Sequence, residues 1–248
     1  NRETLLKPLS SVSGIVERRH TLPILSNLLL EANSEKMVLT ATDLEMQISL
    51  AINTAIGGEL STTISAKKLL DICRALPDNT EINMATSDSR VTVKAGKSKF
   101  NLQTLPAVDY PVMTKAVGTD TVSISLGQST LKRLFKQVEF AMAQQDIRYY
   151  LNGMLLVLEG RELIAVATDG HRLAFSQITL DQAPSGSGQK QEIIIPRKTI
   201  LECQHLLEDS DEPLEISLSA NQIKLSFGDI ELISKLVEGK FPDYQRVI

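Results

Sequence analysis

Apolar residues recur at helical spacing in four segments of the chain, which predicts four amphipathic helices at 4–16, 66–76, 129–143 and 197–207. In the second segment Leu69, Cys73 and Leu76 share one face, and Ser65 just before it is a residue type that caps helix starts. The first segment contains Pro8, which a helix tolerates only near its first turn. We therefore expect Pro8 to lie close to the start of that helix.

Short alternating or β-branched runs lie between these helices and predict strands. The clearest runs are 37–40, 81–84, 90–94 and 98–103 in the first half, and 154–158, 163–167, 192–195, 214–218, 222–227 and 231–236 in the second. Turn-forming sequences such as Gly57-Gly58 separate some of them. Each half thus has the order helix, strands, helix, strands, which predicts an α+β fold with two helices packed on mostly antiparallel sheet.

The two halves repeat the same short sequences. Asn27-Leu28-Leu29-Leu30 precedes Ala41-Thr42-Asp43, and Asn152-Gly153-Met154-Leu155-Leu156 precedes Ala167-Thr168-Asp169. Each copy then has a cysteine, Cys73 or Cys203, and ends on Tyr110-Pro111 or Phe241-Pro242. A repeat of this length indicates a duplicated domain. We therefore expect domains at 1–113 and 114–248, with a boundary within 107–121 and a flexible excursion at 183–191.

The charge of the chain is unevenly distributed. The formal net charge is −4, which alone argues against nucleic-acid binding. The four predicted helices nevertheless carry nine cations and three acids, whereas the remaining residues carry 17 cations and 27 acids. A cationic helix face attracts a polyanion by counterion release, without reading its sequence. A solvated surface is the alternative for any single helix, but four helices of one sign favour the polyanion.

Other classes of protein have little support in the sequence. No apolar run reaches the length of a membrane span, and no secretion signal precedes the first helix, so we expect a cytoplasmic protein without membrane attachment. The two cysteines are expected to be buried in separate helices, without a disulfide. The three histidines have no metal-ligand spacing and no glycine-rich phosphate loop is present, so we expect neither metal nor cofactor.

Several longer sequences resemble the bacterial DNA polymerase sliding clamps, the β subunits of replicative polymerases. They are Thr21-Leu22-Pro23-Ile24-Leu25, Thr42-Asp43-Leu44-Glu45, Asp71-Ile72-Cys73-Arg74, the run from Gln145 to Met154, Ala167-Thr168-Asp169-Gly170-His171-Arg172-Leu173, and Phe241-Pro242-Asp243-Tyr244. The resemblance implies a non-enzymatic processivity factor for DNA replication, with three copies of one domain per subunit and a head-to-tail homodimer around double-stranded DNA. We therefore expect the first strand and the third domain of the family to be missing from this chain.

The resemblance also implies a groove that receives short linear peptides of the replicative polymerase, the clamp loader and repair proteins. It assigns to this groove Leu151, Thr168, Gly170, His171, Arg172, Leu173, Pro242, Arg246 and Val247. An apolar slot with polar rims suits an extended peptide anchored by leucine or phenylalanine. Read without the resemblance, Leu151, Leu173 and Val247 are ordinary core residues.

Residues for contact with DNA follow from the helix charges and from the resemblance together. They are Arg19, Lys68, Arg74, Lys132, Arg133, Lys136, Gln145, Arg148, Tyr149, Tyr150, Arg197 and Lys198. Lys132, Arg133 and Lys136 are predicted to cluster away from the apolar face of their helix. An arginine next to two tyrosines can contact phosphates and stack on bases, although a solvated arginine beside half-buried rings is the alternative.

Two further expectations remain open at this point. Phe100 and Leu102 match the edge strand through which the family dimerises, although an alternating strand can equally be an interior one. A metal-dependent hydrolase using Asp169 and His171, with Asp43, is the alternative function, and a ring closed from two-domain subunits is a further one. Because Asp43 occupies the position of Asp169 in a copy without the histidine, both aspartates are expected to cap turns.

Overall fold

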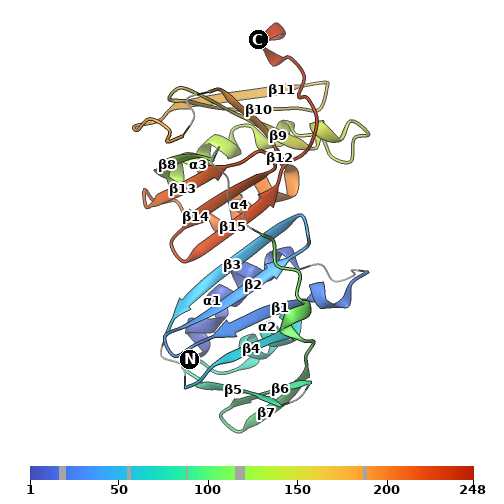
Figure 1. Cartoon of the computed structure of the whole chain (residues 1–248), viewed down its shortest axis with the longest axis vertical. Coiled ribbons are helices and arrows are strands. Elements are labelled where there is room, and N and C mark those ends of the chain that lie inside the picture. Colours follow the sequence, from blue (N-terminus) through green and yellow to red (C-terminus); the bar gives the residue numbers. More distant parts are fainter. Residues whose placement is uncertain (17–20, 55–56, 88, 115–120, 187–188) are drawn as a thin grey trace. The chain divides into compact units, whose positions relative to one another are not determined.

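The computed structural model describes residues 1–16, 21–54, 57–87, 89–114, 121–186 and 189–248. The chain forms two compact units, one of residues 1–113 with 229–231 and one of residues 114–228 with 232–248. Both units contain helices packed on antiparallel sheets (Figure 1), so the predicted α+β class is confirmed. In the described residues, no helix has the length and apolar character needed to cross a membrane.

In the described part of the first unit, two α-helices contact each other and pack on antiparallel strands. Its elements are α1 (Arg2–Val12), β1 (Asn27–Ala32), β2 (Lys36–Thr42), β3 (Met46–Asn53), β4 (Leu60–Ser65) and α2 (Ala66–Ala75), followed by β5 (Ile82–Ser87), β6 (Arg90–Ala95) and β7 (Ser98–Gln103). The sheet order is β4-β1-β2-β3, and β5-β6-β7 form a smaller sheet. Helix α1 packs on β2 and β3, whereas α2 packs on β1 and β4.

The second unit has the same plan. Its elements are β8 (Val122–Gly127), α3 (Gln128–Lys136), β9 (Gly153–Glu159), β10 (Glu162–Thr168), β11 (Leu173–Thr179), β12 (Gln191–Pro196), α4 (Arg197–Leu206), β13 (Pro213–Leu218), β14 (Gln222–Phe227) and β15 (Ile230–Lys235). One sheet has the order β11-β10-β9-β12, and the other contains β15-β14-β13-β8. Helices α3 and α4 contact each other, with α3 on β8 and β11 and α4 on β9 and β12.

Two of the predicted helices agree with the structure almost to the residue, and two do not. Helix α2 begins after Ser65, whose side chain accepts a hydrogen bond from the Lys68 N–H, as predicted. The prediction for Pro8 was wrong, because α1 begins at Arg2 and Pro8 lies inside the helix. The third helix ends at Lys136 rather than at residue 143. The chain continues as a short 3-10 turn that still buries Val138 and Met142.

Strand register refines the internal repeat. Leu29 pairs with Thr40, two residues before Thr42, and Leu155 pairs with Val166, two residues before Thr168. The position of Asn27 is therefore occupied in the second unit by Gly153, and the sequence match of Asn27 to Asn152 is displaced by one residue. The predicted burial of the two cysteines in separate helices is confirmed, and both are free thiols.

Candidate functional site

The segment 168–172 forms a tight turn between β10 and β11. The Asp169 Oδ1 accepts hydrogen bonds from the backbone N–H of His171 at 2.9 Å and of Arg172 at 3.0 Å. The Thr168 hydroxyl donates to the Arg172 carbonyl at 2.7 Å and accepts from the Gly170 N–H at 3.1 Å. Gly170 has φ +89°, a conformation that favours glycine. The side chains of residues 168 and 169 therefore fix the turn through the backbone.

The first unit contains the same turn at residues 42–46. The Asp43 Oδ1 accepts from the N–H of Glu45 at 2.9 Å and of Met46 at 2.7 Å. Leu44 has φ +75° where the second unit has Gly170. The prediction that both aspartates cap turns is thus confirmed. The N–H groups of His171 and Arg172 also hold the pKa of Asp169 below its usual range, because they stabilise the carboxylate.

A second loop, residues 145–152, precedes β9. The Asp146 N–H donates to the Asn152 Oδ1 and the Asn152 amide donates to the Asp146 carbonyl, both at 2.9 Å. The Asp146 carboxylate in turn accepts from Arg148: from the backbone N–H at 2.8 Å, from Nε at 3.0 Å and from Nη2 at 2.9 Å. This two-pronged pairing has the planar geometry that suits a guanidinium and a carboxylate. Arg148 is therefore held in place by its own loop.

Arg148 also connects this loop to the turn at 168–172. Its Nη2 donates to the Asp169 carbonyl at 3.4 Å. A Cβ atom on Gly170 would lie 3.1 Å from Nη2 and 3.2 Å from Nη1 of Arg148, so the absence of a side chain at residue 170 lets the guanidinium pack on the turn. The predicted DNA-contacting loop and the predicted groove wall therefore touch through one side chain.

The ion pair in the loop should be visible in the titration of Asp146. The hydrogen bonds from the Arg148 side chain lower the pKa of Asp146 to about 2. The pKa of an Asp carboxyl in the unfolded chain is about 3.9. Because the pKa of Asp146 is lower in the folded protein, its ionised form stabilises the fold above about pH 3.9, and this stabilisation is lost as the pH falls toward the pKa of the folded protein. We expect Arg148→Lys to raise the pKa of Asp146 toward 3.9, measured by carbon-13 NMR of the carboxyl group. An unchanged pKa in this variant would contradict the pairing.

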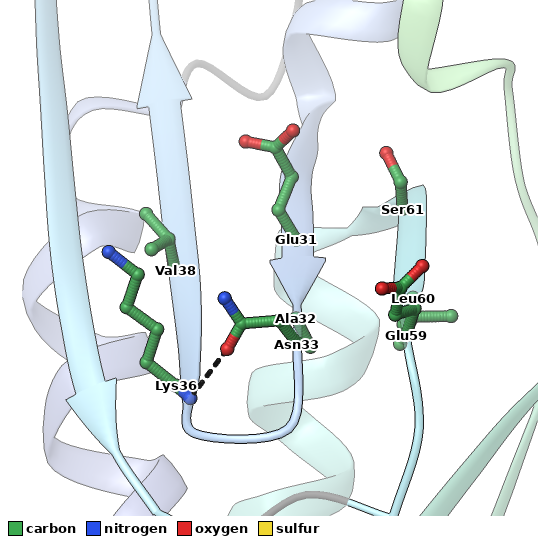
Figure 2. Close-up of a pocket in the computed structure, with 8 residues that line it drawn as sticks. All are labelled: Glu31, Ala32, Asn33, Lys36, Val38, Glu59, Leu60 and Ser61. Carbon is green, nitrogen blue, oxygen red and sulfur yellow. Dashed lines mark hydrogen bonds between the residues drawn. The ribbon is translucent and has the colours of Figure 1, made fainter.

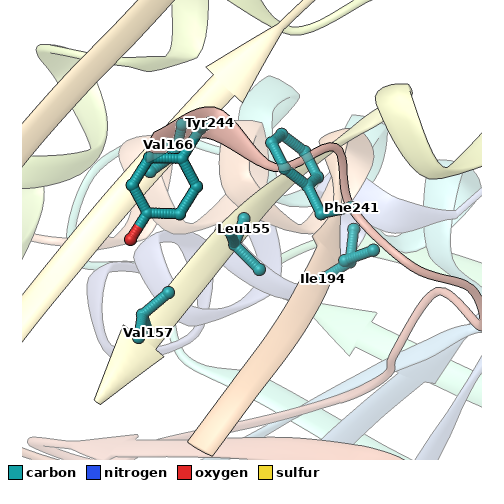
Figure 3. Close-up of a cluster of buried hydrophobic side chains, with 6 residues drawn as sticks. All are labelled: Leu155, Val157, Val166, Ile194, Phe241 and Tyr244. Atoms are coloured by element: carbon teal, nitrogen blue, oxygen red, sulfur yellow. The ribbon is translucent and has the colours of Figure 1, made fainter. Parts of the chain in front are cut away.

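The predicted groove wall lies beside a buried apolar cluster. The cluster is made of Leu155, Val157, Val166, Ile194, Phe241 and Tyr244, and Figure 3 shows the rings of Phe241 and Tyr244 lying over the strands that carry the others. Leu173 packs against this cluster while remaining partly exposed. The C-terminal segment and β11 thus approach each other, so Leu173 lies near the segment that carries Pro242.

The other predicted groove residues differ in exposure. Leu151 and Thr168 are buried, whereas His171, Arg172, Pro242, Arg246 and Val247 are exposed. Arg246 pairs with Asp243 at 2.8 Å. A ligand in solvent can therefore reach the five exposed residues, whereas Leu151 and Thr168 are inaccessible to it.

Two aromatic residues in this region were not predicted. The ring of Phe175 lies 6.1 Å from that of Tyr244, and the Arg172 guanidinium lies 5.6 Å from the ring centre of Phe140. Both phenylalanines are among the exposed large apolar residues. Phe175 could have been found in the sequence, because it shares a strand face with Leu173. Phe140 lies in the 3-10 turn after α3, and it does not share the apolar face on which Val138 and Met142 continue the helical spacing.

The exposed cations of the helices form part of the predicted DNA surface. Lys68, Arg74, Arg133, Lys136 and Lys198 are exposed, and Arg197 is half-buried. Lys132 departs from the predicted cluster, because its ammonium pairs with Asp209 at 3.1 Å and its side chain is only 23% exposed. In the loop, Gln145, Arg148 and Tyr149 are exposed, and the ring of Tyr149 packs edge-on against Tyr150. Arg19 lies outside the described residues.

The predicted dimer strand, β7, lies at an edge of the sheet β5-β6-β7. Leu102 is opposite Val91 and is 8% exposed, whereas Phe100 is opposite Val93 and half-buried. Leu102 therefore packs mainly inside its own unit. Of the two predicted contact residues, Phe100 has the more accessible side chain.

The hollows that lie outside the predicted sites include two among the described residues. One of about 540 Å³ is bordered by β1, β2 and β4, with Glu31, Glu59 and Lys36 at its rim, and Figure 2 shows Asn33 accepting a hydrogen bond from the Lys36 backbone. The other, of about 330 Å³, lies between β12 and residues 236–241 next to Phe241. None of the residues that line them was a candidate in the sequence.

The structure offers no support for the hydrolase alternative. Among the described residues, no group of three or more His, Cys, Asp or Glu side chains is placed to hold a metal ion. The Asp169 carboxylate already accepts hydrogen bonds from the backbone of the turn and from Arg172 Nε, the latter at 2.9 Å. Burial raises the pKa of Cys73 to about 11 and that of Cys203 to about 12, so neither thiol is activated as a nucleophile.

Comparison with known proteins agrees with this geometry. Residues 1–114 match the family model of the DNA polymerase III beta subunit N-terminal domain, and residues 125–243 match that of its central domain. The chain belongs to this family. Within it, the Beta sliding clamp of Pseudomonas aeruginosa is 46% identical over 250 residues, covering 100% of this chain and 66% of the relative.

Solved structures of sliding clamps share the fold. The sliding clamp (DNA polymerase III subunit beta) of Pseudomonas aeruginosa bound to griselimycin has a TM-score of 0.93 at 45% identity, covering 100% of this chain and 66% of that one. The DNA polymerase sliding clamp of Caulobacter crescentus has a TM-score of 0.90 at 39% identity, covering 100% and 67%. The chain thus spans about two thirds of the length of these sliding clamps. These relatives are named as sliding clamps, so the hydrolase alternative is not supported.

Proposed function

We propose that the chain acts in a DNA sliding clamp, which holds a replicative polymerase on double-stranded DNA without reading its sequence. The exposed cations of α2, α3 and α4 carry this proposal. The four helices contain ten cations and three acids within a chain of net charge −4. Such a distribution concentrates attraction for a polyanion on the helices, while the rest of the surface stays acidic.

The proposal includes the position of the chain in a larger assembly. Residues 1–113 and 114–248 serve as the first and second clamp domains, and a third clamp domain completes the subunit in the assembled ring. The edge strand β7, with Phe100, supports a head-to-tail homodimer, because an unpaired edge can extend the sheet of a partner. We place this activity in the cytoplasm.

Binding of a DNA duplex to the chain tests the proposal that the helices contact DNA. A fluorescent duplex oligonucleotide titrated with the chain should bind at low ionic strength, and log K should fall linearly with log salt concentration. Duplexes of unrelated sequence should bind equally well, because the helix cations make contacts with phosphates. Binding that depends on sequence, or none at low salt, would contradict the proposed role.

The groove part of the proposal assigns the turn at 168–172 and the C-terminal segment to short linear peptides of polymerases, clamp loaders and repair proteins. Leu173 and Val247 provide apolar contact, and His171, Arg172 and Arg246 provide polar rims. The bound griselimycin of the Pseudomonas structure supplies a ligand for this test. Griselimycin is therefore a suitable probe of the proposed groove.

The duplicated turn provides a matched pair of variants for the groove. Asp169→Ala and Asp43→Ala each remove two backbone hydrogen bonds from an equivalent turn. We expect Asp169→Ala to weaken griselimycin binding about fivefold in isothermal titration, because loss of the cap disorders the turn that carries His171 and Arg172. A fivefold change corresponds to about 1 kcal/mol. Asp43→Ala should bind it like wild type. Equal binding by all three proteins would reject the groove assignment.

A further inference from the structure

Arg148 lies at the junction of the two proposed sites, and its hydrogen-bond partners Asp146 and Asp169 belong to the second unit. On one side its Nε and Nη2 donate to the Asp146 carboxylate at 3.0 and 2.9 Å. On the other side its Nη2 donates to the Asp169 carbonyl at 3.4 Å. The side chain remains 46% exposed, so a ligand in solvent can reach it. Arg148 thus has a carboxylate partner, a backbone partner and an open face.

The backbone contact is the weaker of the two. Its 3.4 Å length exceeds the usual range for such bonds, whereas the two bonds to Asp146 lie within it. Gly170 brings the turn directly against the guanidinium, since even a Cβ atom there would come within 3.1 Å of Nη2. A shift of the guanidinium toward solvent would therefore remove support from the turn before it broke the pair with Asp146.

A phosphate is the ligand most able to cause such a shift. A guanidinium binds a phosphate through two parallel N–H groups, and a charged acceptor is a stronger partner than a carbonyl. Nη2 uses one N–H for Asp146 and the other for the Asp169 carbonyl, while Nη1 donates no hydrogen bond to any residue that the structure describes. A phosphate that takes Nη1 and Nη2 together must displace the carbonyl.

We infer that a DNA phosphate and the groove wall compete for Arg148, so that DNA bound at the loop 145–150 weakens ligand binding at the turn 168–172. This inference rests on the proposed function, because it needs both DNA and groove ligand to bind. When a phosphate binds the Arg148 guanidinium, the Asp169 carbonyl loses its hydrogen bond from Nη2. The turn is then less ordered, and the groove ligand binds it more weakly. The effect is reciprocal, because linkage requires the ligand to weaken DNA binding by the same factor.

The test measures the dissociation constant of griselimycin with and without a saturating duplex oligonucleotide at low ionic strength. In wild type we expect the duplex to raise the dissociation constant of griselimycin at least about fivefold, which is the lower end of typical allosteric coupling between two sites. In Arg148→Lys the charge remains but the two-pronged geometry is lost. This variant should bind duplex more weakly than wild type, because a phosphate contact is altered, so the duplex concentration is raised until binding is again saturated. The ratio of the two griselimycin dissociation constants should then be near one.

A matched control and a second readout separate this role from a structural one. Arg161 also holds backbone carbonyls, those of Leu180 and Asp181 at 2.7 and 2.9 Å, away from the loop. Arg161→Lys should therefore keep the wild-type ratio. In nitrogen-15 NMR the Gly170 amide signal should move on addition of duplex in wild type and in Arg161→Lys, and should stay in place in Arg148→Lys.

The outcomes distinguish failure of this inference from failure of the proposed function. If both ligands bind wild type independently, or if Arg148→Lys keeps the wild-type ratio, the inference is wrong and the proposed function stands. If neither duplex nor griselimycin binds wild type, the proposed function fails and the inference fails with it. A ratio that disappears only in Arg148→Lys, together with the loss of the Gly170 shift, supports the competition.

Discussion

Replacing Arg133 and Lys136 together by glutamate should weaken duplex binding on the order of a hundredfold at low salt. Both side chains are exposed on the last turn of α3, and each reversal turns an attraction to phosphate into a repulsion. The slope of log K against log salt should fall by roughly two, because about 0.9 counterions are released for each phosphate contact. Lys132→Gln should have a smaller effect, because Lys132 is already paired with Asp209.

The control for this variant changes the net charge equally at another place. Lys36→Glu with Lys94→Glu reverses two exposed cations on strands β2 and β6. We expect this pair to bind duplex within a fewfold of wild type. If both double variants lose affinity equally, the net charge alone determines binding. Since cations in the last turn stabilise a helix by roughly 0.3–1 kcal/mol each, circular dichroism must first show that α3 is intact.

The second large effect concerns stability. We expect Gly153→Ala to lower the free energy of unfolding by about 3 kcal/mol, because forcing extra atoms into a packed site costs this much. A Cβ atom on Gly153 would lie 2.5 Å from the Ile195 carbonyl oxygen and 3.0 Å from the Ile194 side chain. The nearest atom belongs to the backbone of the adjacent strand, so the strand itself must move. Urea unfolding of both proteins measures the difference.

Gly58→Ala is the matched control for this substitution. Nothing lies within 4 Å of a Cβ atom built there, and the backbone is not left-handed. Its free energy of unfolding should remain within about 0.5 kcal/mol of wild type. Equal unfolding midpoints for Gly153→Ala and Gly58→Ala would show that β9 and β12 adapt to the added methyl group, contrary to our expectation.

Local patterns were sufficient to predict much of the fold. Ser65 and Pro196 mark the starts of α2 and α4, because capping and proline effects act within one turn of the helix. The end of α3 was missed because Val138 and Met142 keep helical spacing while the backbone changes to a 3-10 turn. The interior position of Pro8 was missed because burial of Leu5, Leu9 and Val12 outweighs the cost of one missing hydrogen bond.

The resemblance named the candidate residues, but their local roles could be predicted only where the two copies could be compared. Asp43 and Asp169 occur in both copies, and their shared role as turn caps followed from that. The contact between Arg148 and Gly170 joins residues far apart in sequence and has no local signature. The pair of Lys132 with Asp209 likewise arises from tertiary packing, so a count of charges along a helix overstated the free positive charge.

The two turns also differ in how freely they can change. In the first unit a leucine occupies the left-handed position at residue 44, so that backbone shape does not by itself require glycine. In the second unit the guanidinium of Arg148 fills the space where a side chain at residue 170 would extend. Mutational tolerance at these equivalent positions is therefore unequal. A side chain at residue 170 therefore requires a compensating change at Arg148, so we expect these two positions to vary together.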